Sequence, residues 1–295
     1  MGDLTEAERG AFERDGFFVR EGVLGSPELG LLRRAVEAVH ARVVEAASAL
    51  GPSELLDGKR YQRVLDSSIK WEWQADSSQI RSMEPVRHLA PSLDAVLDDP
   101  RLWTPLAALL GVSRLSLFTD KLNFKRPGGA PFPWHQDSLY WVFDCGHVDR
   151  LGSVQIYLDD ATEANGCLWW MPGSHRGGVR AGYTDRGRLA RLYTDLEKLE
   201  PFQRVPIRGA AGSAIFFNAN IVHGSQTNRS GSSRRALVLT YQPAGLPLWR
   251  AAEHRDIADQ FLLGSPAKAV LKQLSRDRAT RLGRAPGRRD VAHAG

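Results

Sequence analysis

The sequence predicts a mainly β protein with α-helices, built on a double-stranded β-helix, a cupin-like jelly roll. Short runs of strand-forming residues are concentrated at about residues 113–243, and turn residues such as Asn165-Gly166 and Pro172-Gly173 separate them. N-terminal and C-terminal helical patterns flank this core, which places helices outside and strands inside. Because no repeat or break in composition divides the chain, we expect one domain over residues 1–284 and a loose basic tail over residues 285–295.

The N-terminal part of the chain is expected to be largely helical. Thr5 can cap a first helix, with Glu8 completing a capping box, and a turn into a short strand follows at residues 15–20. Ser26-Pro27-Glu28 then opens a second helix that carries leucines and valines at helical spacing. Residues 51–80 show no regular pattern and are predicted to be irregular.

The period of the sequence changes toward the centre of the chain. A helix over residues 91–110 is predicted to be interrupted near Pro100. After this helix, the strands of the core are expected at residues 115–124, 152–159, 168–171, 213–223 and 235–242. Residues 247–282 return to a helical pattern and complete the envelope around the core.

Composition indicates a soluble globular protein. The 295 residues are 42% hydrophobic and 25% charged, and no stretch approaches the ~20 apolar residues that span a bilayer. The polar, acidic N-terminus does not resemble a signal peptide, and Cys145 and Cys167 suggest no disulfide framework, so a cytoplasmic location is expected. Much of the net charge of +5 lies near the C-terminus without a nucleic-acid motif. We therefore expect no nucleic-acid or membrane partner, while the oligomeric state, monomer or dimer, stays open.

One His-x-Asp triplet, His135-Gln136-Asp137, and a lone His223 far along the chain are the residues that most suggest chemistry. Two imidazoles and one carboxylate can hold a non-haem Fe(II) on one face and leave positions open for a co-substrate and O₂. If residues 133–140 are extended, His135 and Asp137 point to the same side and can converge on one ion. The alternative for an isolated triplet is a structural hydrogen bond between His and Asp.

Three ordered segments surround these positions. They are residues 122–141, residues 160–175, and His223-Gly224-Ser225 with Arg234 eleven residues after the histidine. Together with residues 12–19 they resemble the phytanoyl-CoA dioxygenase family, and the resemblance covers about residues 8–243. It implies an oxygenase that depends on Fe(II), 2-oxoglutarate and O₂, with a metal held by His135, Asp137 and His223.

By the same resemblance, Arg234 is expected to bind the distal carboxylate of 2-oxoglutarate. A guanidinium presents a planar fork that matches a carboxylate, and Arg235 has the same chemistry. On a strand the two arginines point to opposite faces, so only one of them can enter the barrel. If Arg234 points inward, Ala236, Val238 and Thr240 do so as well.

Further residues are expected to contact the co-substrate. Lys121, Asn123 and Lys125 share one face of a predicted strand; by resemblance Asn123 bonds the proximal end of 2-oxoglutarate, and Lys121 or Lys125 adds positive charge. The alternative for Lys125 is a solvated turn residue. Ser225 can add a hydroxyl group, with a turn residue as its alternative, and Phe132 can wall the pocket.

Substrate contacts are expected from Trp141, Gln155, Tyr157, Lys70 and Trp134. Gln155 and Tyr157 alternate with apolar neighbours, so one of the two sets faces the site. For Trp134 and Trp141, as for Phe132, the alternative is packing in the core. Residues 61–74 are a plausible lid, and substrate choice is expected there and on the loop over residues 179–202.

The expected function is hydroxylation, or another oxidation, of an unactivated C–H bond in a small organic metabolite, with release of succinate and CO₂. Secondary metabolism is a plausible setting. Alternatives with the same cofactors are desaturation, cyclisation, epimerisation and endoperoxide formation. A non-redox cupin-like binding protein or isomerase is the alternative from another class, which retention of the full ligand set disfavours. Related halogenating enzymes have Ala or Gly where this chain has Asp137, so halide-independent chemistry is expected.

Overall fold

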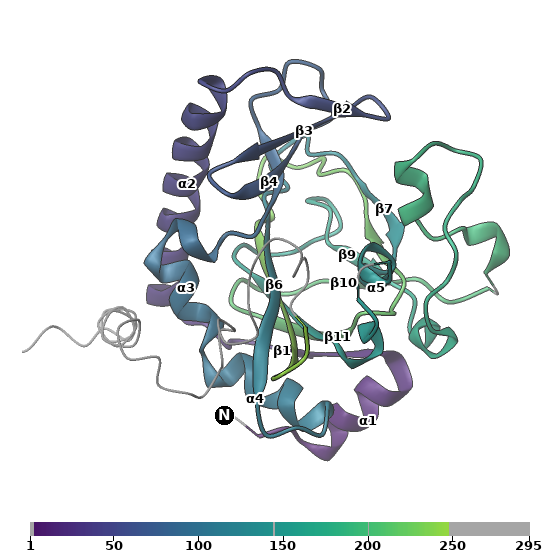
Figure 1. Cartoon of the computed structure of the whole chain (residues 1–295). Coiled ribbons are helices and arrows are strands. Elements are labelled where there is room, and N and C mark those ends of the chain that lie inside the picture. The colour runs from purple at the N-terminus through teal and green to yellow at the C-terminus, as the bar shows by residue number, and fades with distance from the viewer. Residues whose placement is uncertain (1–2, 144, 200, 248–295) are drawn as a thin grey trace, which may run out of the picture.

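The computed structural model describes residues 3–143, 145–199 and 201–247 of the chain. Two antiparallel sheets form its centre, and helices cover the outer side of the larger sheet (Figure 1). This arrangement confirms the predicted jelly roll with helices around it. The helical pattern predicted over residues 247–282, except for Pro247, and the basic tail over residues 285–295 lie outside the described residues.

The N-terminal helices begin where the sequence predicts. At the start of α1 (Glu6–Asp15), the Glu8 amide donates to Thr5 Oγ1 at 3.2 Å and the Thr5 amide donates to the Glu8 carboxylate at 2.8 Å. β1 (Phe17–Arg20) and α2 (Ser26–Ser48) follow. α2 belongs to the larger hydrophobic core through its buried residues Leu32, Val36, Val39 and Val43. Neither α2 nor any other helix among the described residues is long and apolar enough to cross a membrane.

Residues 51–80 are largely ordered in strands, which corrects the prediction of an irregular segment. They contain β2 (Glu54–Leu56), β3 (Lys59–Val64) and β4 (Ser67–Trp71), which join the large sheet through β5 (Ile80–Glu84). These strands are short and carry many half-buried polar residues, so no hydrophobic alternation marks them. The Asp57-Gly58 pair, with φ angles of 49° and 71°, is the sequence signal that identifies the hairpin between β2 and β3.

Helices α3 (Pro91–Leu97) and α4 (Pro100–Leu109) confirm the predicted interruption near Pro100. Asp99 caps α4 by accepting a hydrogen bond from the Arg101 amide at 3.0 Å. The 3₁₀-helix η1 (Arg87–Leu89) precedes α3. Figure 1 shows α2, α3 and α4 along the same side of the molecule, outside the strands.

The remaining strands and short helices build the centre of the fold. They are β6 (Leu115–Asn123), β7 (Phe132–His135), α5 (Asp137–Trp141), η2 (Val148–Arg150), β8 (Gly152–Tyr157), β9 (Leu168–Trp170), η3 (Ser174–Gly177), η4 (Leu189–Leu192), η5 (Leu196–Lys198), β10 (Val205–Ile207), β11 (Ala214–Asn218), β12 (His223–Ser225) and β13 (Ala236–Pro243). The large sheet has the order β1-β11-β8-β13-β6-β5-β4-β3-β2, and the small sheet has the order β10-β9-β12-β7. The strand predicted over residues 213–223 is therefore two strands in different sheets.

Alternation along β13 divides the interior into two layers. Leu237 and Leu239 belong to the core on the helical side, together with Ile156 of β8. Ala236 and Val238 belong instead to the core on the side of the small sheet. This confirms the predicted inward face of β13, so a site between the two sheets is reached only by side chains of that face.

Candidate metal and co-substrate site

The antiparallel pairing of β7 and β12 brings the two predicted histidine ligands together. His135 and His223 are direct cross-strand partners, although they are far apart in the sequence. Their Nε2 atoms lie 3.6 and 3.9 Å from Asp137 Oδ1, and the ligand atoms of all three residues lie within 4.8 Å of one another. Residues 133–140 are not one extended strand, which corrects that expectation. β7 ends at His135 and α5 begins at Asp137, so the start of the helix places the carboxylate beside the imidazoles.

Backbone carbonyl groups orient both imidazoles. His135 Nδ1 lies 2.7 Å from the Pro133 oxygen, and His223 Nδ1 lies 3.0 Å from the Ile221 oxygen. A carbonyl oxygen only accepts hydrogen bonds, so Nδ1 carries the proton in each ring. Each Nε2 atom therefore presents a lone pair toward Asp137, which is the arrangement typical of metal-binding histidines.

The pKa values of Asp137 and His223 favour the protonation states that coordination requires. Burial by itself would raise the pKa of Asp137, but the neighbouring His135 and His223 hold it well below its usual range. Burial, assisted by His135, lowers the pKa of His223 to about 4. A neutral imidazole and an ionised carboxylate are both ligands near pH 7, and two nitrogens with one carboxylate suit Fe(II) with open positions.

A cavity of about 40 Å³ adjoins these three residues, and we call it the metal cavity. The predicted residues Arg234, Asn123, Gln155, Lys121 and Phe132 all line it. Asn123 Oδ1 and Gln155 Nε2 are buried and have no hydrogen-bond partner among the described residues. Because buried polar atoms are usually satisfied in a folded protein, these orphaned atoms indicate a ligand that forms hydrogen bonds, and Arg234 indicates that the ligand is an anion. The residues present therefore fit a metal-bound dicarboxylate.

Arg234 enters the metal cavity from just before β13. Its side chain is 1% exposed, and Nε donates to the Gly166 oxygen at 3.1 Å. Among the described residues no other group accepts a hydrogen bond from its guanidinium, so the terminal nitrogens are available to a carboxylate.

The turn at Asn165-Gly166 holds the carbonyl group that supports Arg234. The Asn165 side chain accepts from the Thr162 amide and donates to the Asp160 oxygen, both at 2.8 Å. Gly166 has φ of 75°, and a Cβ atom there would lie 2.6 Å from the Gln226 oxygen. A residue with a side chain would not fit this turn without strain. The Asn-Gly pair of the sequence motif therefore holds the Gly166 carbonyl group in the place where it positions Arg234.

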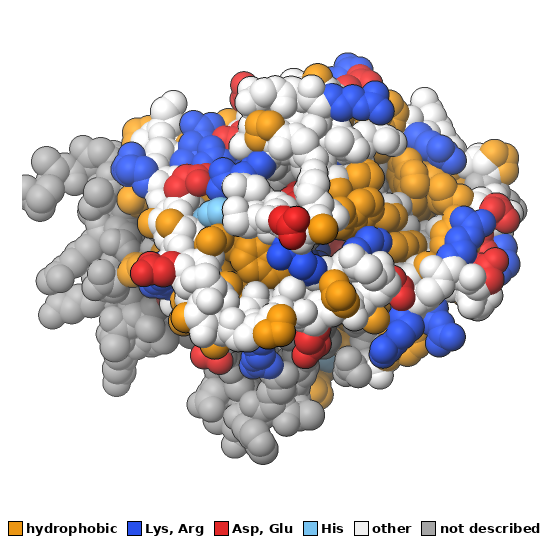
Figure 2. Space-filling view, turned by 90° about the horizontal axis from the view of Figure 1, so that it is seen from above, with side chains coloured by type: hydrophobic (Ala, Val, Ile, Leu, Met, Phe, Trp, Pro, Cys, Tyr) orange, Lys and Arg blue, Asp and Glu red, His pale blue; other side chains and the backbone are white. Residues whose placement is uncertain are grey.

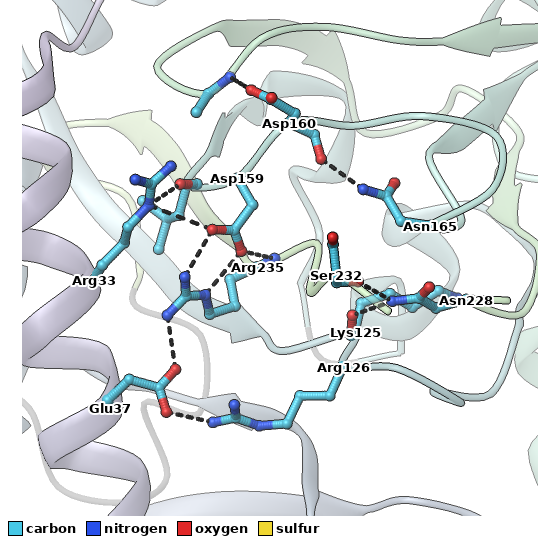
Figure 3. A network of polar contacts seen from close by, with 12 residues as sticks. Arg33, Glu37, Lys125, Arg126, Asp159, Asp160, Asn165, Asn228, Ser232 and Arg235 are labelled. Carbon is cyan, nitrogen blue, oxygen red and sulfur yellow. Dashed lines mark hydrogen bonds and ion pairs between the residues drawn. The ribbon is translucent and has the colours of Figure 1, made fainter. Parts of the chain in front are cut away.

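Arg235 points away from the metal cavity, as one alternative predicted. Its guanidinium bonds the Asp159 carboxylate at 2.7 and 2.8 Å and the Glu37 carboxylate at 2.7 Å. Figure 3 shows this chain of ion pairs, which continues from Glu37 on α2 to Arg126. Arg235 therefore links the large sheet to α2, whereas its neighbour Arg234 lines the metal cavity.

Lys125 is not a solvated turn residue, which corrects that alternative, and it is not among the residues that line the metal cavity. It follows the end of β6, is fully buried, and donates to Ser225 Oγ at 3.0 Å and to the Ala130 oxygen at 2.9 Å. Burial, with a contribution from Arg234, lowers the pKa of Lys125 to about 6. Ser225 thus receives a bond from Lys125, and it is not among the residues that line the metal cavity.

Two larger cavities open beside the metal cavity. A polar cavity of about 250 Å³ is lined by Trp141, Thr240 and Glu84, and a second cavity of about 230 Å³ is lined by many aromatic rings and is called the aromatic chamber. The predicted Lys70 lines both of them, from β4. Tyr140 does so as well, and the sequence did not single it out; its position in the helical turn after Asp137 is the signal that could have identified it.

Two of the expected substrate contacts lie elsewhere. Trp134 lines none of these three cavities, and its ring lies against Arg204 at 5.3 Å. Tyr157 is fully buried in the inner core and donates its hydroxyl to the Ile207 oxygen at 2.8 Å. Tyr157 therefore packs in the core, and its polar end is already satisfied by a backbone carbonyl group.

The roof of the aromatic chamber consists of β3, β4 and the predicted substrate loop over residues 179–202. Tyr61 from β3 and Leu189, Leu192 and Tyr193 from the loop line the chamber. The Leu189 amide donates to the Asp57 carboxylate at 2.6 Å and so ties the loop to the β2–β3 turn. Figure 2 looks down on this end of the molecule and shows hydrophobic side chains gathered there, with Lys and Arg side chains beside them.

The fold and the residue cluster define a class of protein: a jelly-roll metalloprotein with an open site of two histidines and one carboxylate. Comparison with known proteins supplies the family. The family described as Phytanoyl-CoA dioxygenase (PhyH) matches residues 12–236, and the chain belongs to this family. The protein is accordingly an Fe(II)- and 2-oxoglutarate-dependent oxygenase, with O₂ as the usual co-substrate.

Similar proteins cover most of the fold. The chain is 31% identical over 194 residues to a probable alpha-ketoglutarate-dependent hypophosphite dioxygenase of Stutzerimonas stutzeri, which covers 63% of this chain and 65% of that protein. It is 28% identical over 249 residues to an ectoine dioxygenase of Bordetella parapertussis, covering 78% of this chain and 73% of that protein. The crystal structure of EctD from S. alaskensis with bound Fe is 25% identical, with a TM-score of 0.61, and covers 83% of this chain and 79% of that one.

Proposed function

We propose that this oxygenase hydroxylates an unactivated C–H bond of a small organic metabolite. The observation that carries the proposal is the convergence of His135, Asp137 and His223 on one cavity that also receives the buried Arg234. When bound, Fe(II) with 2-oxoglutarate and O₂ supplies the oxidising power, and succinate and CO₂ are released. The two relatives described above are named for small substrates, hypophosphite and ectoine, which supports a small substrate here.

The roles we propose for individual residues follow from their places in the cavities. His135, Asp137 and His223 hold the iron, Arg234 binds the distal carboxylate of 2-oxoglutarate, and the side-chain amide nitrogen of Asn123 donates a hydrogen bond to its other end. These side chains are pre-oriented by the protein, which lowers the entropic cost of assembling the reactants.

A second group of residues is proposed to hold the substrate and exclude water. Tyr140 and Trp141 follow Asp137 on α5 and line the larger cavities, so they border any substrate close to the metal. The Tyr140 ring packs edge-on against the His135 ring at a centroid distance of 5.6 Å. Bulky rings at this position shield the reacting centre from bulk water.

The test begins with the purified protein and Fe(II) without oxygen. 2-Oxoglutarate should produce the visible absorption of its Fe(II) chelate, and air should then give succinate, slowly alone and faster with a suitable substrate. The structure of the product is determined by mass spectrometry and NMR. A new hydroxyl group distinguishes hydroxylation from desaturation, cyclisation, epimerisation and endoperoxide formation. Succinate formation that persists after exhaustive chelation would contradict the proposal.

A further inference from the structure

Among the described residues, the aromatic chamber is lined by cations and by no carboxylate. Its charged lining residues are all cations, namely Lys59, Arg60, Lys70, Arg81 and Lys121. The polar cavity beside it differs, because its lining includes the carboxylates of Glu84 and Asp137. A one-sign lining in a confined space raises the local concentration of ligands of the opposite charge.

The arginines of the chamber already have partners in the protein. Arg81 donates to the Ala130 and Pro131 oxygens and lies 3.7 Å from the Glu72 carboxylate. Arg60 donates to the Ser77 oxygen and packs over Trp71. These two residues are therefore part of the wall.

Lys70 and Lys121 differ from the arginines. Among the described residues neither ammonium group has a hydrogen bond or an ion pair. Lys70 Nζ lies instead over the rings of Tyr140 and Tyr61, at 5.3 and 5.9 Å from their centroids. Both lysines are half-buried. Taking an ammonium group partly out of water without a hydrogen-bond partner is costly, and two such groups near each other repel. A bound anion removes both penalties.

We infer that the aromatic chamber binds the substrate through an oxyanion group, a carboxylate, sulfonate or phosphonate, which Lys70 and Lys121 receive. The body of the substrate then lies against the rings of Tyr61, Tyr140 and Tyr193. This inference rests on the proposed function and specifies the class of substrate for it.

The position of Lys121 connects this oxyanion site to the reacting centre. Lys121 lines the aromatic chamber, the polar cavity and the metal cavity, and His135 lines both the chamber and the metal cavity. An anion held by Lys121 therefore places the adjoining C–H bonds close to the proposed iron. The site is separate from that of 2-oxoglutarate, because Arg234 lines only the metal cavity and Lys70 lines only the other two.

The test compares probes of one shape and different charge. Benzoate, benzenesulfonate, phenylphosphonate and neutral benzamide are titrated into the protein loaded with Fe(II) and 2-oxoglutarate without oxygen. Binding is followed by calorimetry and by the fluorescence of the chamber residues Trp71 and Trp73. At least one anion should bind about tenfold or more tightly than benzamide, because only the anion pairs with the half-buried ammonium groups of Lys70 and Lys121.

Variants locate the effect. Lys70→Met should reduce the affinity for the preferred anion by about tenfold or more while leaving benzamide binding nearly unchanged. Lys70→Arg keeps the charge and should retain the preference for anions. Arg14→Met is the control for loss of a cation, because Arg14 is exposed on α1, pairs with Asp15 and does not line the chamber. Circular dichroism of each variant establishes that it is folded.

The possible outcomes separate this inference from the proposed function. Equal affinity for benzoate and benzamide, no binding of any anion, or an unchanged anion preference in Lys70→Met would overturn the oxyanion site. Substrate-independent succinate formation by the wild-type protein tests the proposed function on its own. If the wild-type protein forms no succinate but still prefers the anion, only the proposed function is contradicted.

Discussion

The metal cavity and the aromatic chamber are neighbours, yet the protein builds them differently. In the metal cavity, hydrogen bonds to backbone carbonyl groups orient the side chains that would contact the metal and the co-substrate. Both imidazoles bond such carbonyls, and Arg234 bonds the Gly166 oxygen. In the chamber, Lys70 and Lys121 have no polar partner among the described residues. The rigid region can therefore serve one set of cofactors, whereas the unpartnered region depends on an incoming ligand and determines which substrate is accepted.

The supports of the two regions differ as well. The metal cavity lies between paired strands of both sheets, and His135 and His223 are a cross-strand pair. The roof of the chamber is the β2–β4 meander together with the loop over residues 179–202, joined through the bond between the Leu189 amide and Asp57. A mutation in the metal cavity should accordingly abolish chemistry, while a mutation in the roof should change which molecule reacts.

The largest effect is expected from the histidine ligands. His135→Ala and His223→Ala should each abolish iron binding and 2-oxoglutarate turnover, because a site that keeps only two of three ligands holds the metal weakly. Metal content after dialysis and succinate formation measure this. His88→Ala is the matched control, since His88 bonds the Leu65 oxygen outside the metal cavity, and it should remain active.

Asp137→Gly is expected to weaken iron binding strongly without removing the histidines. The wild-type enzyme should need no chloride or bromide, because the Asp137 carboxylate occupies the position that a halide would take. Product formed under ¹⁸O₂ in the presence of chloride should carry ¹⁸O in a hydroxyl group. A chlorinated product from the wild-type enzyme would overturn the assignment of Asp137 as a ligand.

The metal cavity could be predicted from the sequence far better than the chamber. The three ligands and Arg234 stand in short motifs whose residue types follow from the chemistry, so spacing and resemblance were enough to bring them together. Lys125 was less predictable, since it leaves the strand with φ of 36° and turns toward Ser225. The meander was missed because its polar strands lack alternation, although Asp57-Gly58 marks its first hairpin.

The next largest effect is expected from Arg234, and it should distinguish this residue from its neighbour Arg235. Arg234→Ala should raise the 2-oxoglutarate concentration for half-maximal turnover by roughly 30-fold or more, because losing one partner of a buried charged pair costs ~2–5 kcal/mol. Arg235→Ala should leave that concentration nearly unchanged but lower the free energy of unfolding by about 1–3 kcal/mol, since Asp159 and Glu37 each lose one of their arginine partners. Steady-state kinetics and denaturant unfolding provide the two readouts. Equal kinetic effects would mean that Arg234 does not contact the co-substrate.

A smaller effect is expected from the turn that supports Arg234. Gly166→Ala should destabilise the protein by about 1–3 kcal/mol and raise the 2-oxoglutarate requirement, because the new Cβ would meet the Gln226 oxygen and the Lys125 side chain. Gly128→Ala is a matched control: Gly128 has φ of 76°, but no atom lies within 4 Å of the position that a Cβ would take there. The control isolates backbone strain, so an equal kinetic effect in both variants would contradict the supporting role of Gly166.

The smallest effect is the pH dependence of anion binding in the aromatic chamber. Burial, followed by the charge of Lys121, lowers the pKa of Lys70 to about 7; Arg81 acts in the same direction, and Glu84 and Asp137 oppose it. The charged form binds an oxyanion, so the affinity for the preferred anion should fall as the pH rises above about 7, by at most about tenfold per pH unit.

The stability of the unliganded protein should change in the opposite direction. The folded-state pKa of Lys70 lies below the usual value of 10.5, so the unfolded chain binds more protons between about pH 7 and that value. The contribution of Lys70 to the free energy of unfolding therefore increases across this interval, while the anion affinity decreases. Calorimetric titrations and denaturant unfolding at several pH values measure both slopes. Lys70→Met should flatten each of them, and a variant that keeps both slopes would show that another group is responsible.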